Sequence, residues 1–197
     1  MAVTMDQVKE LRERTGAGIL DCKNVLNQTN GDMDAAIKVL REKGLASAAK
    51  KADRTASDGR IEVYVHSGNK MVAVVEVNCE TDFVAKTDDF KKLAYDLAMH
   101  IAAARPTYVS REEVPEAEIE RERDILREQN AGSNKPANII EKIVEGRIEK
   151  FYGEVALLEQ DFVKDPSVKI KDMIKEAIAK LGENIVVRRF TRYEIGG

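Results

Sequence analysis

The sequence predicts an α+β protein, with an N-terminal group of helices followed by a small antiparallel sheet that carries further helices. Three observations predict this class. Apolar residues recur at helical spacing through residues 1–45 and in several later segments. The period changes to two in RIEVYVH, and Gly-Asn separates this run from a second, apolar strand-like run that ends at residue 77. A charged helical stretch over about residues 110–155 then interrupts the second half. A hairpin with helices across it is a common α+β arrangement.

Residues 1–45 are predicted to form three short helices. We expect Asp32 to cap the third helix and Gly44 to end it in the left-handed conformation. So small a bundle buries little surface and is marginal alone. The polar stretch ASAAKKADRTASDG that follows is typical of a linker, with some helix in it. The apolar stripes are Val8 and Leu11, then Ile19, Leu20, Val25 and Leu26, then Ala35, Ala36, Val39 and Leu40.

The next segments predict a hairpin and a helix across it. RIEVYVH places Ile61, Val63 and Val65 on one side of a strand, and MVAVVEV returns as the second strand after Gly68-Asn69. The segment DDFKKLAYDLAMHIAAA has one apolar helical face, and Pro106 ends that helix. The face consists of Phe90, Leu93, Ala94, Leu97, Ala98 and Ile101.

Residues 110–155 predict a helical hairpin with a thin apolar seam. NAGSNKP interrupts the pattern, and Pro136 is well placed at the start of the second helix. An arm of this kind often ends in an interface. Its apolar residues are Ile119, Ile125, Leu126, Ile139, Ile140, Ile143, Val144, Ile148 and Phe151.

The C-terminal segments predict one more helix and one more strand. The helix covers about residues 170–181 and stops at Gly182. NIVVRRFTRYEI then has an imperfect alternation, because Arg188 and Arg192 share a face with apolar residues. Either a bulge or an edge position in the sheet explains that pattern.

Composition and missing motifs exclude several classes of function. The net charge is −3, without the basic excess typical of nucleic-acid binders, so no direct nucleic-acid contact is expected. There is no phosphate-binding glycine loop, and the two cysteines and two histidines do not have the spacing of a metal site. We therefore expect neither a cofactor nor a metal nor an enzyme. No leader peptide and no membrane-spanning run is visible, which predicts a soluble cytoplasmic protein that acts by contact.

The stretch NCETDFVAK, residues 78–86, carries an unusual residue. Phe83 lies where the chain should turn at the surface after a strand, although loop tips are usually polar because their backbone needs water. The residues alone leave two readings open. Phe83 either folds back onto the core of its own chain or remains exposed to contact a partner.

Two longer motifs point to a family. LRERTGAGILDCKNVL (11–26) and EVNCETDFVAK (76–86) closely resemble the two signature regions of the bacterial elongation factor Ts family. Further similarity in LAMHIAAARP, KIVEGRIEKFYGEV and FVKDPS extends the resemblance over nearly the whole chain. The resemblance implies a ubiquitin-associated-type helical domain with its linker over residues 1–52. It also implies an α+β core over residues 53–197, with the helical hairpin inserted at about 110–155.

The family resemblance also implies a function, as guanine-nucleotide exchange factor for elongation factor Tu in its GDP-bound and nucleotide-free states. In this reading the Asp82–Phe83 turn inserts near the phosphate and Mg²⁺ site of the GTPase. A second contact is expected around Ile19 and Leu20, because two adjacent apolar residues cannot both face inward on one helix. The residues implied are Thr81, Asp82, Phe83 and Val84, then Arg12, Ile19, Leu20 and Lys23, and also His100. The alternative for His100 is a position on the flank of its helix without a partner contact.

One departure from the family pattern concerns stoichiometry. Longer members look as if they contain two copies of the core half-domain, whereas only one hairpin, residues 61–77, is visible here. The chain therefore resembles the short form, in which a second subunit could supply the missing surface. We expect a homodimer and a two-plus-two complex with the GTPase, with the seam of the helical arm as the candidate interface.

Two other classes of function compete with this reading. A binding adaptor would use residues 1–50 alone, and Phe83 would be dispensable. An enzyme would use the carboxylates near Glu80 and Asp82, but the sequence offers no second catalytic group at a recognisable spacing.

Overall fold

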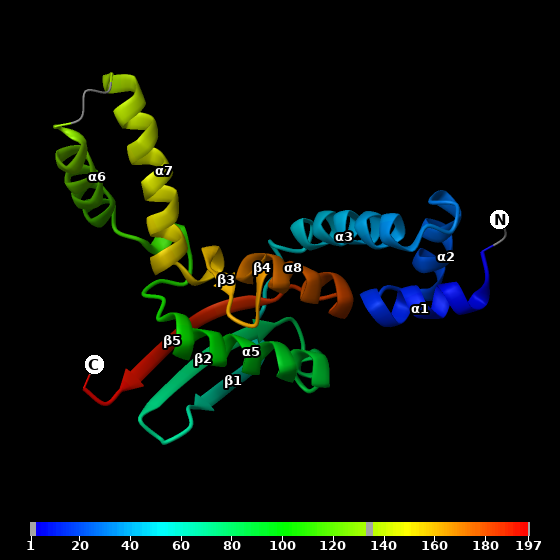
Figure 1. Cartoon of the computed structure of the whole chain (residues 1–197). Helices are drawn as coiled ribbons and strands as arrows, with labels where there is room; N and C mark the ends of the chain where they lie inside the picture. Colours follow the sequence, from blue (N-terminus) through cyan, green and yellow to red (C-terminus); the bar gives the residue numbers. More distant parts are fainter. Residues whose placement is uncertain (1–2, 133–135, 197) are drawn as a thin grey trace. The chain divides into compact units, whose positions relative to one another are not determined.

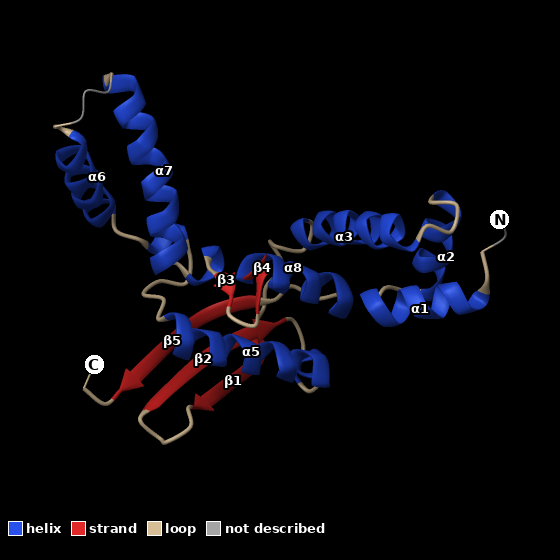
Figure 2. Ribbon diagram, in the orientation of Figure 1, coloured by secondary structure: helices blue, strands red, loops and turns tan. Residues whose placement is uncertain are grey.

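The computed structural model describes residues 3–132 and 136–196 and contains both helices and sheets, as expected of an α+β protein (Figures 1 and 2). Its main sheet has three strands, and a separate pair of short strands forms a second sheet. The predicted fold class is therefore confirmed at this level. The ubiquitin-associated-type arrangement of the N-terminal helices stays a prediction.

Contacts between residues divide the chain into two compact units that are each built from distant segments. The first contains the described residues up to Ile61 together with Val77–Ala94 and Asp172–Val186. The second contains Glu62–Glu76, Tyr95–Lys171 and the described residues from Val187 onward. The boundary expected near residue 52 stays a prediction.

The N-terminal helices α1 (Met5–Thr15), α2 (Ile19–Gln28) and α3 (Met33–Ala49) confirm the three predicted for this part of the chain. A capping box between Thr4 and Gln7 begins α1, because each side chain binds the other residue's backbone N–H. The three helices share one apolar cluster, so the amphipathic stripes meet as expected. The cluster contains Val8, Leu11, Cys22, Val25, Leu26, Ala36 and Leu40.

The end of α3 differs from the prediction. Asp32 caps the start of the helix as expected, but the helix continues past Gly44 to Ala49. A Cβ atom added at Gly44 would lie 3.0 Å from the Cβ of Ala179 in helix α8 (Ile170–Leu181). Gly44 thus lies inside α3 rather than at its end. Its missing side chain allows α3 and α8 to approach closely within the first unit.

The main sheet confirms the predicted hairpin and third strand. Strands β1 (Asp58–Val65) and β2 (Met71–Cys79) are joined by a turn in which Gly68 has φ 89° and Asn69 has φ 55°. This left-handed pair is typical of the tight turns of hairpins. The strand order is β1-β2-β5, with β5 spanning Val186–Glu194, so β5 lies at an edge as its irregular sequence suggested (Figure 2).

Strand β5 accommodates its arginines at that edge. Arg188 and Arg189 are both exposed, so the alternation of the strand is broken between them. Arg192 instead donates from Nε to the carbonyl oxygen of Ala102, 3.0 Å away in helix α5 (Asp88–Ala104). Arg189 donates from Nε to Oε2 of Glu76 in β2, 2.7 Å away. Arginines of β5 thus bind a neighbouring strand and a helix carbonyl despite the break in alternation.

The two sides of β1 and β2 differ in burial. In β1, Tyr64 contacts Tyr95 of α5 edge-on, with ring centroids 5.7 Å apart. The opposite side of β1 carries the β1 apolar row, Ile61, Val63 and Val65, which are 64%, 49% and 53% exposed. Along β2, the buried residues alternate as expected for a half-covered strand. They are Ala73, Val75, Val77 and Cys79.

The helical hairpin is formed by α6 (Glu116–Asn130) and α7 (Ala137–Val155), and Pro136 precedes α7 as predicted. Part of the predicted seam is buried between the two helices, whereas Ile125 and Ile139 are 42% and 39% exposed. The hairpin therefore satisfies most of its apolar seam internally. Its core contains Val114, Ile119, Leu126, Val144 and Ile148.

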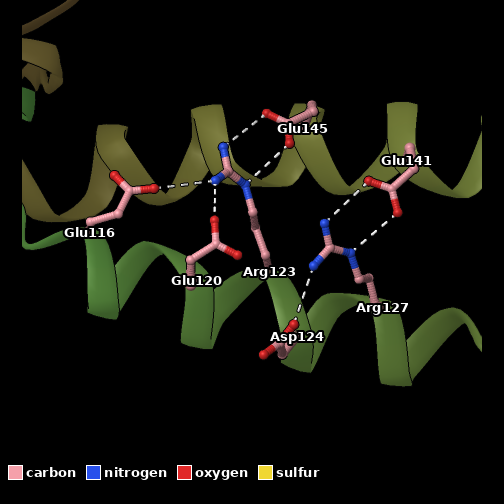
Figure 3. Close-up of polar contacts among 7 residues, drawn as sticks. All are labelled: Glu116, Glu120, Arg123, Asp124, Arg127, Glu141 and Glu145. Carbon is pink, nitrogen blue, oxygen red and sulfur yellow. Dashed lines mark hydrogen bonds and ion pairs between the residues drawn. The ribbon is translucent and has the colours of Figure 1, made fainter.

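Two arginines of α6 bind carboxylates of α7 (Figure 3). Arg123 Nε lies 3.2 Å from Glu145 Oε1, and Arg127 Nε lies 3.2 Å from Glu141 Oε1. Exposed ion pairs contribute only about 0.2–1 kcal/mol each. The pairs therefore align the two helices, while the apolar core supplies most of the stabilisation.

Several short elements are not predicted by the sequence. They are helix α4 (Asp82–Ala85), strands β3 (Asp161–Phe162) and β4 (Asp165–Lys169), and 3₁₀ turns at Arg111–Glu113 and Leu157–Glu159. Each is too short to show a period, so only tertiary contacts reveal it.

The hairpin offers a test that compares two isoleucines of one helix. Ile119 is 4% exposed and Ile125 is 42% exposed. Ile119→Ala should lower the free energy of unfolding by about 2–5 kcal/mol, because it leaves a cavity in the hairpin core. Ile125→Ala should cost less than about 1 kcal/mol. Urea unfolding of both variants measures the difference, and equal losses would contradict the assignment of the core.

Candidate functional site

The Phe83 turn, defined as Thr81, Asp82, Phe83 and Val84, lies between β2 and α5. Thr81 caps the four-residue helix α4, and its Oγ accepts the N–H of Val84 at 3.5 Å. Ala85 is buried, so it attaches the end of the turn to the protein, whereas Phe83 is 80% exposed. The structure therefore places Phe83 in solvent rather than in the core.

Two side chains next to the turn, Cys79 and Lys86, form hydrogen bonds to residues of the turn itself. Asp82 accepts a hydrogen bond from Lys86, and this bond raises the pKa of the Lys86 ammonium group. Cys79 is buried before the turn and donates its S–H to the carbonyl oxygen of Thr81, 3.1 Å away. Burial raises the pKa of Cys79 to about 11. Its thiol thus stays protonated at neutral pH, and a protonated thiol is a poor nucleophile.

Glu183, just after α8, contacts the turn and was missed by the sequence reading. One carboxylate oxygen, Oε2, accepts the backbone N–H groups of Glu80 and Thr81, each at 3.0 Å. The other, Oε1, accepts the hydroxyl of Thr81 at 2.6 Å. Because 102 residues separate Thr81 from Glu183, no local pattern could have indicated this contact.

The first turn of α2 forms a second exposed surface. Ile19 and Leu20 are 51% and 71% exposed, and Arg12 and Lys23 are exposed as well. The opposite side of α2 is buried, which leaves these two apolar residues outside the core, as their adjacency suggested. Contact with a partner through this surface stays a prediction. The buried residues of α2 are Cys22, Val25 and Leu26.

His100 is fully buried rather than on a surface. Its Nδ1 accepts the backbone N–H of Val163 at 3.3 Å, so the hydrogen of the neutral ring is on Nε2. Nε2 then donates to Oε1 of Gln160, 2.9 Å away. His100 therefore joins α5 to the residues on either side of β3 within the second unit, and its side chain is not exposed in this structure. The partner contact expected of His100 stays a prediction.

Two features bear on other classes of site. Within residues 3–132 and 136–196, no three His, Cys, Asp or Glu side chains are grouped so that they could hold a metal ion. No helix in the same residues is long and apolar enough to cross a membrane.

Comparison with known proteins connects these surfaces to one family. Residues 20–197 match the family described as Elongation factor TS. The chain is similar to Elongation factor Ts of Herpetosiphon aurantiacus, with 80% identity over 100% of this chain and 99% of the relative. It is also similar to Elongation factor Ts of Carboxydothermus hydrogenoformans, with 60% identity over 98% of this chain and 89% of the relative. The similarity therefore includes both exposed surfaces.

The buried His100 predicts a pH dependence of stability. Burial lowers the pKa of His100 in the folded chain below its ordinary value. As pH falls below about 6.5, the unfolded chain gains a proton that the folded chain resists, so stability falls by up to about 1.4 kcal/mol per pH unit. His100→Gln should lose this part of the pH dependence. Urea unfolding at pH 7 and pH 5.5 measures it, and equal pH dependence in both proteins would contradict the prediction.

Proposed function

Because the chain belongs to the elongation factor Ts family of guanine-nucleotide exchange factors for elongation factor Tu, we propose that it releases GDP by inserting the Phe83 turn near the phosphate and Mg²⁺ site of that GTPase. The observation that carries this proposal is the 80% exposure of Phe83 on a turn whose flanking residues are fixed. An exposed aromatic side chain at a fixed position is suited to insertion between elements of a partner.

Exchange of this kind requires no chemical step by the protein. The exchange factor binds the nucleotide-free GTPase more tightly than the GDP-bound form, and by linkage it weakens GDP binding by the same factor. Phe83 supplies apolar surface that is buried only in the complex. Asp82 either orients the turn through its bond to Lys86 or contacts the partner directly. In this reading the chain needs no cofactor and acts in the cytoplasm.

The exposed surface of α2 provides a second contact in this proposal. Ile19 and Leu20 would bind the nucleotide-binding domain of elongation factor Tu, with Arg12 and Lys23 beside them. Residues 1–52 would thus act as a ubiquitin-associated-type docking domain, while the Phe83 turn weakens GDP binding. If residues 1–50 bound a partner and Phe83 were dispensable, the adaptor reading would hold instead.

A homodimer, and hence a two-plus-two complex, is proposed to form through the sheet. The helical hairpin buries Leu126 and Val144 in its own core, so little of its seam remains available. By contrast, the β1 apolar row is at least 49% exposed along its length. Exposed apolar rows of this kind mark interaction surfaces. A second copy of the chain, with the same row, would cover it symmetrically.

Replacement of Phe83 tests the mechanism. Burying a Phe side chain is worth about 1.5–3 kcal/mol, and about 1.4 kcal/mol is tenfold in an equilibrium. Phe83→Ala should therefore weaken binding to nucleotide-free elongation factor Tu by about ten- to a hundredfold. Its melting temperature should barely change, because the side chain is exposed in the free protein.

The matched control is Phe90, which is fully buried in α5. Phe90→Ala should lower the free energy of unfolding by about 3–5 kcal/mol. Release of labelled GDP and thermal melting, measured on both variants, distinguish insertion from a core role. A large loss of melting temperature in Phe83→Ala, with exchange retained at a permissive temperature, would show that the proposed mechanism is wrong.

The dimer is tested with two isoleucines on different surfaces. Ile61→Glu places a charge in the β1 apolar row and should convert the dimer to a monomer, because the charge would be buried in the interface. Ile125→Glu, on the helical hairpin, should leave the dimer intact. Light scattering at micromolar concentrations measures both variants. A monomeric parent protein, or dissociation by Ile125→Glu alone, would contradict the proposal.

A further inference from the structure

We propose that Glu183 is a positioning residue for nucleotide exchange, because its carboxylate holds the Phe83 turn in the orientation needed for insertion. This inference rests on the proposed function. It assigns a role to a residue that lies outside both motifs and that acts through the Phe83 turn rather than through a contact of its own with the partner.

The carboxylate of Glu183 binds the start of the turn at three points. It accepts the N–H groups of Glu80 and Thr81 and the hydroxyl of Thr81, at 3.0, 3.0 and 2.6 Å. Hydrogen bonds to an ionised acceptor are shorter and about twice as strong as bonds between neutral groups. Both oxygens are engaged, so the carboxylate fixes the direction as well as the position of the chain before Phe83.

Hydrogen bonds run in both directions between the pair Glu80-Thr81 and the pair Glu183-Asn184. Glu80 accepts the backbone N–H of Asn184 at 2.7 Å, while Glu183 accepts the backbone N–H of Glu80. Asn184 is buried, and its side-chain amide donates to the carbonyl oxygens of Ala52 and Arg54 at 3.1 and 2.8 Å. The backbone of Ala52 and Arg54, after α3, is therefore bound by Asn184, while the neighbouring Glu183 binds the start of the Phe83 turn.

The turn needs such support from outside. Helix α4 has four residues, and a helix of that length is not stable by itself. Phe83 is 80% exposed, so its own side chain contributes little packing in the free protein. The Thr81 hydroxyl accepts the N–H of Val84 while it donates to Glu183. The carboxylate thus also orients the cap of α4 directly before Phe83.

The test measures GDP release from elongation factor Tu by Glu183 variants in two backgrounds. In the parent protein, Glu183→Ala should lower kcat/KM for exchange by about tenfold, within the range of coupling between residues of one network. Glu183→Gln keeps an acceptor for the two N–H groups and should lose less. In a Phe83→Ala background, Glu183→Ala should cost less than about twofold, because the side chain that it positions is absent.

A matched control is Glu149 of α7, whose carboxylate accepts a hydrogen bond from Arg111 of the preceding 3₁₀ turn at 2.9 Å. Glu149→Ala should leave exchange unchanged in either background. Glu183→Gln also keeps the test valid if Glu183→Ala does not fold, because it preserves the size of the side chain.

The outcomes separate this inference from the proposed function. If Phe83→Ala alone leaves exchange unchanged, the proposed function fails. If Phe83→Ala slows exchange but the Glu183 variants exchange at the parent rate, the positioning role is wrong and the proposed function stands. Equal fold losses from Glu183→Ala in both backgrounds would also overturn the positioning role, since they would mean that Glu183 acts independently of Phe83.

Discussion

An aromatic side chain that stays in water cannot stabilise the loop that carries it. Phe83 is 80% exposed, so the free energy of burial that normally fixes an aromatic residue is not available in the free protein. The turn must therefore be held by its flanks. Cys79 and Ala85 are buried on either side, and Glu183 binds the backbone between them. Polar contacts thus do at this turn what apolar packing does elsewhere in the chain.

The same division between a stabilising side and an exposed side recurs in α2 and β1. In α2, the residues that face the three-helix core are buried, while Ile19 and Leu20 remain exposed. In β1, Tyr64 contacts α5, while the β1 apolar row lies on the other side. Each element is held by one side, so the apolar residues of its other side are free for association.

Two residues show why the surroundings of a side chain cannot be derived from the sequence alone. His100 follows the apolar face of α5, which suggested a position on the helix flank. Its two ring nitrogens instead bind Gln160 and the N–H of Val163, so the ring is fully buried at no cost in unmade hydrogen bonds. Gly44 was expected to end α3, but the helix continues to Ala49. A side chain at position 44 would crowd Ala179 of α8, so the glycine provides space between two helices rather than a helix end.

The sequence by itself determined the type of most elements, the hairpin turn at Gly68-Asn69, the cap at Asp32, and the family. Those features depend on periods, caps and motifs within a few residues of one another. It also indicated that Ile19 and Leu20 could not both be buried. Only the tertiary structure decided that Phe83 is exposed, that Glu183 holds its turn, and that His100 is buried. The contacts of Glu183 and His100 join residues 60 to 103 positions apart, which no local pattern records.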